Sequence, residues 1–193
     1  MSQYIEGDEY GVATIEPAEP IIAGQYGTWR LTYTCGDEVL PVGTCLHIYT
    51  DSDTDWEMPQ FLDPSAPDYM TLQTPDGVHA MVKAINLKRL VVVLGGRELK
   101  TGEALTVVFG DPGDGNPGTR AQTFIDQRRY FWVDVELPGQ QQRLTLVNSP
   151  CLPVVGDQPI NLVVTVPSTM SLGEGFRLLL KAEDQWGNPA HGY

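Results

Sequence analysis

Short alternating segments, interrupted by turn residues, are the feature that most constrains the fold of this chain. Its 193 residues include 20 glycines and 15 prolines, which divide it into short stretches. In residues 28–35 an apolar set, Trp29, Leu31, Tyr33 and Cys35, alternates with a polar set, Thr28, Arg30, Thr32 and Thr34. Successive side chains of a β-strand point to opposite faces of a sheet, so a period of two is typical of a half-buried strand. The sequence therefore predicts an all-β chain.

The same pattern predicts further strands at regular intervals. They are residues 46–50, 69–74, 78–83, 89–94, 104–109, 121–124, 130–136, 143–147, 160–166 and 176–183. Strands that recur about every 8 to 15 residues, with turn residues between them, are typical of two packed antiparallel sheets. We therefore predict an antiparallel β-sandwich of the immunoglobulin-like kind, with a barrel as the alternative. The continuous apolar run at 90–94 favours a central strand, followed by a hairpin turn at Gly95–Gly96.

Prolines and glycine gather at residues 150–159, where they predict a linker, because proline cannot donate to a β-ladder. The linker would separate a sandwich domain, 1–149, from a C-terminal segment, 160–193. An immunoglobulin-like domain needs about seven strands, and the two or three in this segment are too few for a core of their own. We expect an incomplete second β module, which packs on the first domain or belongs to a truncated chain.

The charge of the chain excludes several classes of partner. It carries 25 acidic and 12 basic residues, a net charge of -13. Such a surface repels phosphate backbones and anionic lipid headgroups, so we expect neither nucleic acid nor membrane as a partner. The sequence has no apolar run near the ~18 residues that a membrane-spanning helix needs. It also opens without a basic and apolar leader, which favours a cytoplasmic location.

The cysteines indicate neither a zinc site nor a disulfide framework. Cys35, Cys45 and Cys151 are odd in number and form no CxxC pair, so we predict buried thiols. The segment between Cys35 and Cys45 is rich in turn formers. A bridge across a hairpin there is therefore the alternative, in an oxidising compartment.

The segment DSDTDWE is the strongest candidate in the sequence for a site with a chemical function. Its carboxylates, Asp51, Asp53 and Asp55, stand at alternate positions and would converge on a hard cation such as Ca²⁺ if the loop curls. The likeness to an EF-hand loop ends quickly, because the sixth position is Trp56 and the twelfth is Leu62. We expect a solvated acidic loop, with a calcium site as the alternative and no other cofactor in this chain.

Two further residues are candidates for ligand binding. Trp56 is predicted to be exposed, where an aromatic ring can stack on a sugar, whereas Trp29 and Trp132 lie on predicted strands and are core candidates. Arg120 follows the glycine-rich loop 110–118, whose backbone permits a ligand-binding nest, so it could clamp an anion. The alternative is that Arg120 pairs with an acidic side chain.

Catalytic motifs are missing from the sequence. The three histidines, His47, His79 and His191, have no metal-ligand spacing, and there is no Gly-x-Ser-x-Gly elbow. An acid–base pair between the acidic loop and Asp111 or Asp114 has no support from spacing. We therefore expect no enzyme in this chain.

Several motifs resemble one group of bacterial proteins. They are IEP at 15–17, GTWRLTYT at 27–34, DW at 55–56, PQF at 59–61, GD at 110–111 and PGTRAQTF at 117–124. Together they resemble the N-terminal region of a bacterial family catalogued as a domain of unknown function. The tail, with VTVPST at 164–169, FRLL at 176–179 and AEDQWGNP at 182–189, is similar to that family and to bacterial immunoglobulin-like modules. The resemblance covers nearly the whole chain.

In that family, similar β modules precede a C-terminal part that resembles a PHP-type metal-dependent hydrolase with an Asp-x-His-like metal motif. This sequence lacks the motif, so the resemblance assigns no metal ligand here and implies an enzyme downstream of Tyr193. It implies a non-catalytic accessory region that orders or shields the catalytic part or helps to assemble an oligomer. The partners would then be the chain's own downstream catalytic domain or oligomer neighbours. The alternative is a stand-alone carbohydrate- or cation-binding module that uses Trp56, Arg120 and the acidic loop.

Overall fold

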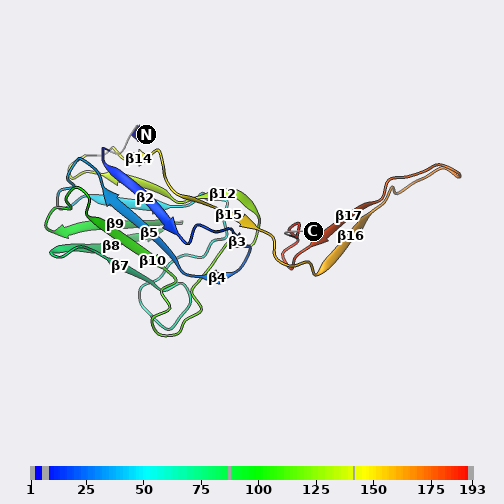
Figure 1. Cartoon of the computed structure of the whole chain (residues 1–193), viewed down its shortest axis with the longest axis horizontal. Coiled ribbons are helices and arrows are strands. Elements are labelled where there is room, and N and C mark those ends of the chain that lie inside the picture. Colours follow the sequence, from blue (N-terminus) through cyan, green and yellow to red (C-terminus); the bar gives the residue numbers. More distant parts are fainter. Residues whose placement is uncertain (1–2, 6–8, 87, 141, 191–193) are drawn as a thin grey trace.

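The computed structural model describes residues 3–5, 9–86, 88–140 and 142–190. Every regular element in these ranges is a β-strand. The described residues therefore contain no helix that could span a membrane. Figure 1 shows a layered β body from which the C-terminal hairpin projects. The all-β prediction is confirmed.

Two sheets form the body. The larger has the order β1 (Gln3–Ile5), β14 (Leu144–Leu146), β13 (Trp132–Glu136), β6 (Cys45–Tyr49), β9 (Arg89–Gly96) and β8 (Val78–Asn86). The smaller has the order β2 (Gly11–Glu16), β5 (Trp29–Cys35), β10 (Ala104–Phe109) and β7 (Met70–Gln73). All neighbours are antiparallel except β1 and β14. The body is a β-sandwich, as the alternation predicted.

The core lies between these sheets and is built from the inward half of each alternating strand. The smaller sheet supplies Leu31, Tyr33, Leu105 and Val107, and the larger supplies Leu46, Ile48, Val92, Leu94, Val133 and Val135. All of these side chains are almost completely buried. A strand places every second residue on the same face, so alternate residues of each strand reach the core, even in β9, whose sequence is apolar throughout 90–94.

Short sheets close one end of the sandwich. One pairs β4 (Tyr26–Gly27) with β11 (Thr119–Arg120), and the other has the order β12 (Asp126–Tyr130), β15 (Cys151–Val155) and β3 (Ile21–Ile22). The predicted linker 150–159 is therefore wrong over β15, which is a paired strand. Its proline, Pro153, lies where the register between β12 and β15 shifts. A β-irregularity needs no ladder donor, so it tolerates a proline inside a strand.

Most predicted strands are confirmed to within a few residues, but one predicted strand and one predicted turn are wrong. Residues 121–124 form no strand, because Ala121 donates to the Gln25 carbonyl, and Gln122 accepts from Gly24, in irregular backbone. The hairpin turn at Gly95–Gly96 is also wrong, since both glycines belong to β9 and pair with β8. β9 does lie between two strands, although its burial alternates.

The cysteines carry free thiols. Cys35 lies in the smaller sheet and Cys45 in the larger, so no hairpin joins them and the alternative of a bridge between them is wrong. The Cys35 thiol lies within hydrogen-bonding distance of the Glu38 and Leu99 carbonyls, at 3.4 Å each. Burial raises the pKa of both Cys35 and Cys45, which keeps these thiols protonated and unreactive.

The C-terminal segment forms one hairpin. In it β16 (Asn161–Thr165) pairs antiparallel with β17 (Leu179–Glu183), and in the described part of the chain the only further pairing of either strand is an isolated bridge between Glu183 and Pro189. Every residue from 160 to 181 is exposed, and the hairpin extends away from the sandwich (Figure 1). The predicted short second β module is thus a lone two-stranded ribbon.

Candidate functional site

The acidic loop lies at the end of the sandwich, between β6 and β7, and binds a buried arginine. Arg129 is only 1% exposed and its guanidinium lies 3.2 Å from Asp53, 3.6 Å from Asp51 and 2.9 Å from Asp126. A buried cation is tolerated only when opposite charges and hydrogen bonds compensate its lost hydration. Asp51 and Asp53 therefore serve as counter-ions of Arg129 in this structure.

Asp55, the third candidate metal ligand, faces a different set of partners. Its carboxylate accepts hydrogen bonds from the Thr123 amide at 2.8 Å and the Thr123 hydroxyl at 2.7 Å. Burial opposes the charged form of Asp55, but these bonds and the nearby charge of Arg120 together lower its pKa. The three aspartates thus point to different protein groups. In the described ranges, no three His, Cys, Asp or Glu side chains are grouped to hold a metal ion.

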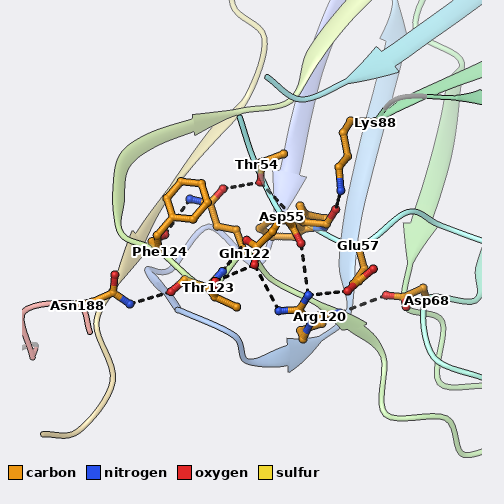
Figure 2. Close-up of polar contacts among 11 residues, drawn as sticks. Thr54, Asp55, Glu57, Asp68, Lys88, Arg120, Gln122, Thr123, Phe124 and Asn188 are labelled. Carbon is orange, nitrogen blue, oxygen red and sulfur yellow. Dashed lines mark hydrogen bonds and ion pairs between the residues drawn. The ribbon is translucent and has the colours of Figure 1, made fainter. Parts of the chain in front are cut away.

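Arg120 also belongs to this network, which Figure 2 shows in close-up. Its guanidinium lies 2.5 Å from Glu57 and 3.6 Å from Asp55, and the Glu57 contact raises its pKa. The side chain is mostly buried by these partners. The pairing of Arg120 with an acidic side chain, the alternative to an anion clamp, is therefore what the structure has.

Trp56 lies in the core, and the prediction that it is exposed is wrong. It is 5% exposed and makes edge contacts with Trp29, at a ring distance of 5.0 Å, and with Phe131, at 5.2 Å. Arg129 and Arg120 form ion pairs with the loop on either side of this ring, and the ring packs on the core. The signal was present in the sequence, because Thr54 and Trp56, both buried, alternate with the charged residues around them.

A small cavity of about 30 Å³ lies beside Trp56 and is lined mainly by apolar side chains, including Ile48, Leu90 and Phe109. That volume is roughly the share of one water molecule in the liquid, far below the ~300 Å³ of a small-molecule pocket. The Lys88 ammonium donates to the Trp56 carbonyl. The space does not fit a sugar ring.

The histidines lie apart from this site. His47 on β6 is buried and its Nε2 lies 2.9 Å from Glu136 on β13. Burial lowers its pKa, although Glu136 opposes the shift. His79 lies on β8, two strands away from β6, and His191 lies outside the described residues.

The turn after β17 fixes the hairpin to the body. Asp184 is completely buried and accepts hydrogen bonds from the amides of Asp157, Trp186 and Asn188 at 2.9–3.0 Å. The Asn188 amide group donates to the Thr123 carbonyl at 2.8 Å, and its oxygen accepts from Ile125. Thr123 is the residue that binds Asp55, so one polar network runs from the acidic loop to the base of the hairpin (Figure 2).

We call residues 184–190 the anchor turn. Close packing supports its hydrogen bonds, since a side chain at Gly24 would overlap the Trp186 ring and one at Gly156 would overlap the Pro189 carbonyl. The sequence of this segment carries one local signal of its conformation. Its Asp184 and Asn188 are typical of turns that bind their own backbone, but their bonds to the body needed the structure.

The hairpin has two unlike faces. Leu162 opposes Ala182 and Val164 opposes Leu180, which puts these four side chains on one side, here called the apolar face. The other face carries Asn161, Val163, Thr165, Leu179, Lys181 and Glu183. On that second face, Lys181 and Glu183 form an ion pair of 2.8 Å. The apolar face is therefore the side of the ribbon that water solvates poorly.

No protein-family model and no curated protein matches the chain. The resemblance to the N-terminal region of a hydrolase family accordingly stays a prediction.

Proposed function

We propose that this chain is a non-catalytic structural module whose projecting hairpin assembles it with another β-structured protein part. One observation carries the proposal: an exposed ribbon with an apolar face is held to the sandwich by a buried polar anchor. Isolated two-stranded hairpins are marginal in water and gain stability when a hydrophobic face is covered. Large contiguous apolar patches on a soluble protein mark interaction sites.

The distribution of apolar side chains supports this function. Of the exposed large apolar residues, a block lies in and around the hairpin: Ile160, Leu162, Val163, Val164, Val166, Met170, Leu172, Phe176, Leu178, Leu179, Leu180 and Trp186. The sandwich buries its core residues between its sheets, although it also exposes apolar side chains such as Phe61, Leu62 and Met81. The anchor turn then fixes the position at which the hairpin is presented.

The resemblance found in the sequence extends the proposal. It makes the chain an accessory region, with immunoglobulin-like character, of a metal-dependent hydrolase whose catalytic part lies elsewhere. In that setting the hairpin would order or shield the catalytic part or join neighbouring subunits. The acidic loop would serve the module's own stability, because its charged groups are held by Arg129, Arg120 and Thr123.

Photo-crosslinking in cells tests the proposed function. A photoreactive amino acid is placed at Leu162 or Leu180 on the apolar face, and at Asp114 in an exposed loop of the body as the control. We expect crosslinked products at both hairpin positions and few at position 114. Equal labelling at all three positions, or none on the hairpin, would contradict an assembly role.

A further inference from the structure

We propose that the occupant of the apolar face is the hairpin of a second copy of this chain, packed face to face across a two-fold axis. This inference rests on the proposed assembly function and names its partner. Two apolar ribbons that pack at about 10 Å would form a small four-stranded sandwich, the usual way for two sheets to cover apolar faces.

The apolar face is large and open. Leu162 is 64% exposed, Val164 51% and Leu180 58%. Ile160 and Val166 flank β16 at 65% and 51% exposure and extend the row. None of these side chains has a polar atom, so the face needs only another apolar surface and no hydrogen-bonding partner. The same face on a second copy meets that requirement.

Charge does not oppose a like partner at the hairpin. The chain carries a net charge of -13, so two copies repel each other over most of their surfaces. The hairpin, residues 160–183, is neutral, because Glu174 and Glu183 balance Arg177 and Lys181. Its Lys181–Glu183 pair lies on the opposite face. The apolar face is thus a region where two acidic copies meet without like charges opposed.

The shape of the molecule allows the contact. The hairpin projects from the sandwich (Figure 1), so two ribbons can overlap while the acidic bodies stay apart. A contact between identical patches is isologous and closes as a dimer rather than growing into a filament. The anchor turn keeps the ribbon in place, which lowers the conformational entropy lost on pairing.

The test is the mass of the purified 193-residue chain in solution, measured by light scattering and sedimentation from low to high micromolar concentration. We expect a reversible dimer of twice the 21.2 kDa chain mass. The matched variants are Leu180→Asp on the apolar face and Leu179→Asp, its neighbour on the opposite face. Leu180→Asp should weaken the dimer at least tenfold, whereas Leu179→Asp should change it little.

Each outcome either supports or overturns the proposal that a second copy covers the apolar face. A wild-type chain that stays monomeric, forms open-ended polymers, or responds equally to both variants overturns the proposal. Near-ultraviolet circular dichroism of the buried Trp29 and Trp56 confirms that both variants keep the sandwich fold. If the chain is monomeric but position 180 still crosslinks to a different polypeptide in cells, the assembly function stands and only the second copy fails.

Discussion

At the scale of single residues, Arg129 is the most consequential side chain of the acidic loop. Burying a guanidinium costs much hydration energy, and three carboxylates from two segments offset that cost. The same carboxylates are more exposed than the arginine, so they keep part of their hydration. The planar guanidinium, with five donors, suits this position better than a lysine ammonium would.

Replacing Arg129 with alanine should destabilise the chain. The substitution leaves a cavity and removes the counter-ion of the loop, and we expect a loss of about 2–4 kcal/mol in the free energy of unfolding. Urea denaturation measures this loss. Arg128→Ala, at the exposed neighbouring position, is the control and should stay within about 0.5 kcal/mol of the wild type. Equal midpoints for the two variants would show that the buried arginine contributes nothing.

Calcium should leave the stability of the chain unchanged. Asp51 and Asp53 face Arg129, and Asp55 accepts two hydrogen bonds from Thr123, so a cation would have to displace protein partners. Thermal unfolding in millimolar Ca²⁺, with Mg²⁺ and a chelator as controls, measures the effect. A midpoint that rises with Ca²⁺ alone would restore the calcium site as the function of the loop.

At the scale of elements, the anchor turn joins a well-packed sandwich to a poorly covered ribbon. Asp184 gathers backbone donors from both sides of the hairpin, from Asp157 before β16 and from Trp186 and Asn188 after β17. A carboxylate that accepts several amide hydrogen bonds holds its partners firmly, because charge-assisted bonds are about twice as strong as neutral ones. The ribbon therefore starts from a fixed base although its strands face water.

The attachment of the hairpin should weaken in acid. Burial opposes the charged form of Asp184, but the bonds from Asn188, Asp157 and Trp186 outweigh it and lower the pKa. A folded-state pKa below the ordinary 3.8 means that this stabilisation is complete above that value and is lost as the pH falls through the folded-state pKa. Hydrogen exchange of residues 157–190, corrected for intrinsic rates, measures the loss.

The variant Asp184→Asn separates this effect from the titration of other acids. Asparagine resembles the protonated carboxyl group, so protection around the anchor turn should already be low at neutral pH and should change little in acid. Protection of β5 and β10 should be the same in the variant and the wild type. A variant that retains full protection of the hairpin at neutral pH would refute the role of Asp184.

At the scale of the whole molecule, charge and apolar surface are segregated. The acidic excess lies outside the neutral hairpin, and the exposed apolar side chains are concentrated on it. An acidic surface keeps copies apart, and its repulsion weakens when salt screens it. Apolar contact between hairpins, by contrast, does not depend on opposite charges.

Added sodium chloride should therefore strengthen the association of two copies. Screening becomes effective at separations beyond about 8 Å at physiological ionic strength, which is shorter than the distance across a domain. Sedimentation at increasing salt concentration and constant pH measures the dissociation constant of the dimer. Association that weakens with salt would mean that ion pairs, rather than the apolar face, hold the copies together.

The sequence by itself determined the fold class and most strand positions. Alternation in β5 assigns each of its side chains to a face, and a local rule of this kind needs no knowledge of distant neighbours. The sequence also indicated that the C-terminal strands are too few to build a core.

Tertiary structure decided the rest, because the deciding contacts join residues far apart in the chain. Arg129 binds Asp53 of the acidic loop, and no local pattern specifies a pair of residues 76 positions apart. β15 pairs with β3 and β12 despite its proline, since an irregular register tolerates a missing donor. The role of the anchor turn likewise depends on a long-range contact, the hydrogen bond from the Asn188 side chain to the Thr123 carbonyl. Ion pairs and hydrogen bonds join residues that are distant in the sequence, so they depend on the tertiary structure. Alternation is a property of neighbouring residues, so it can be recognised in the sequence alone.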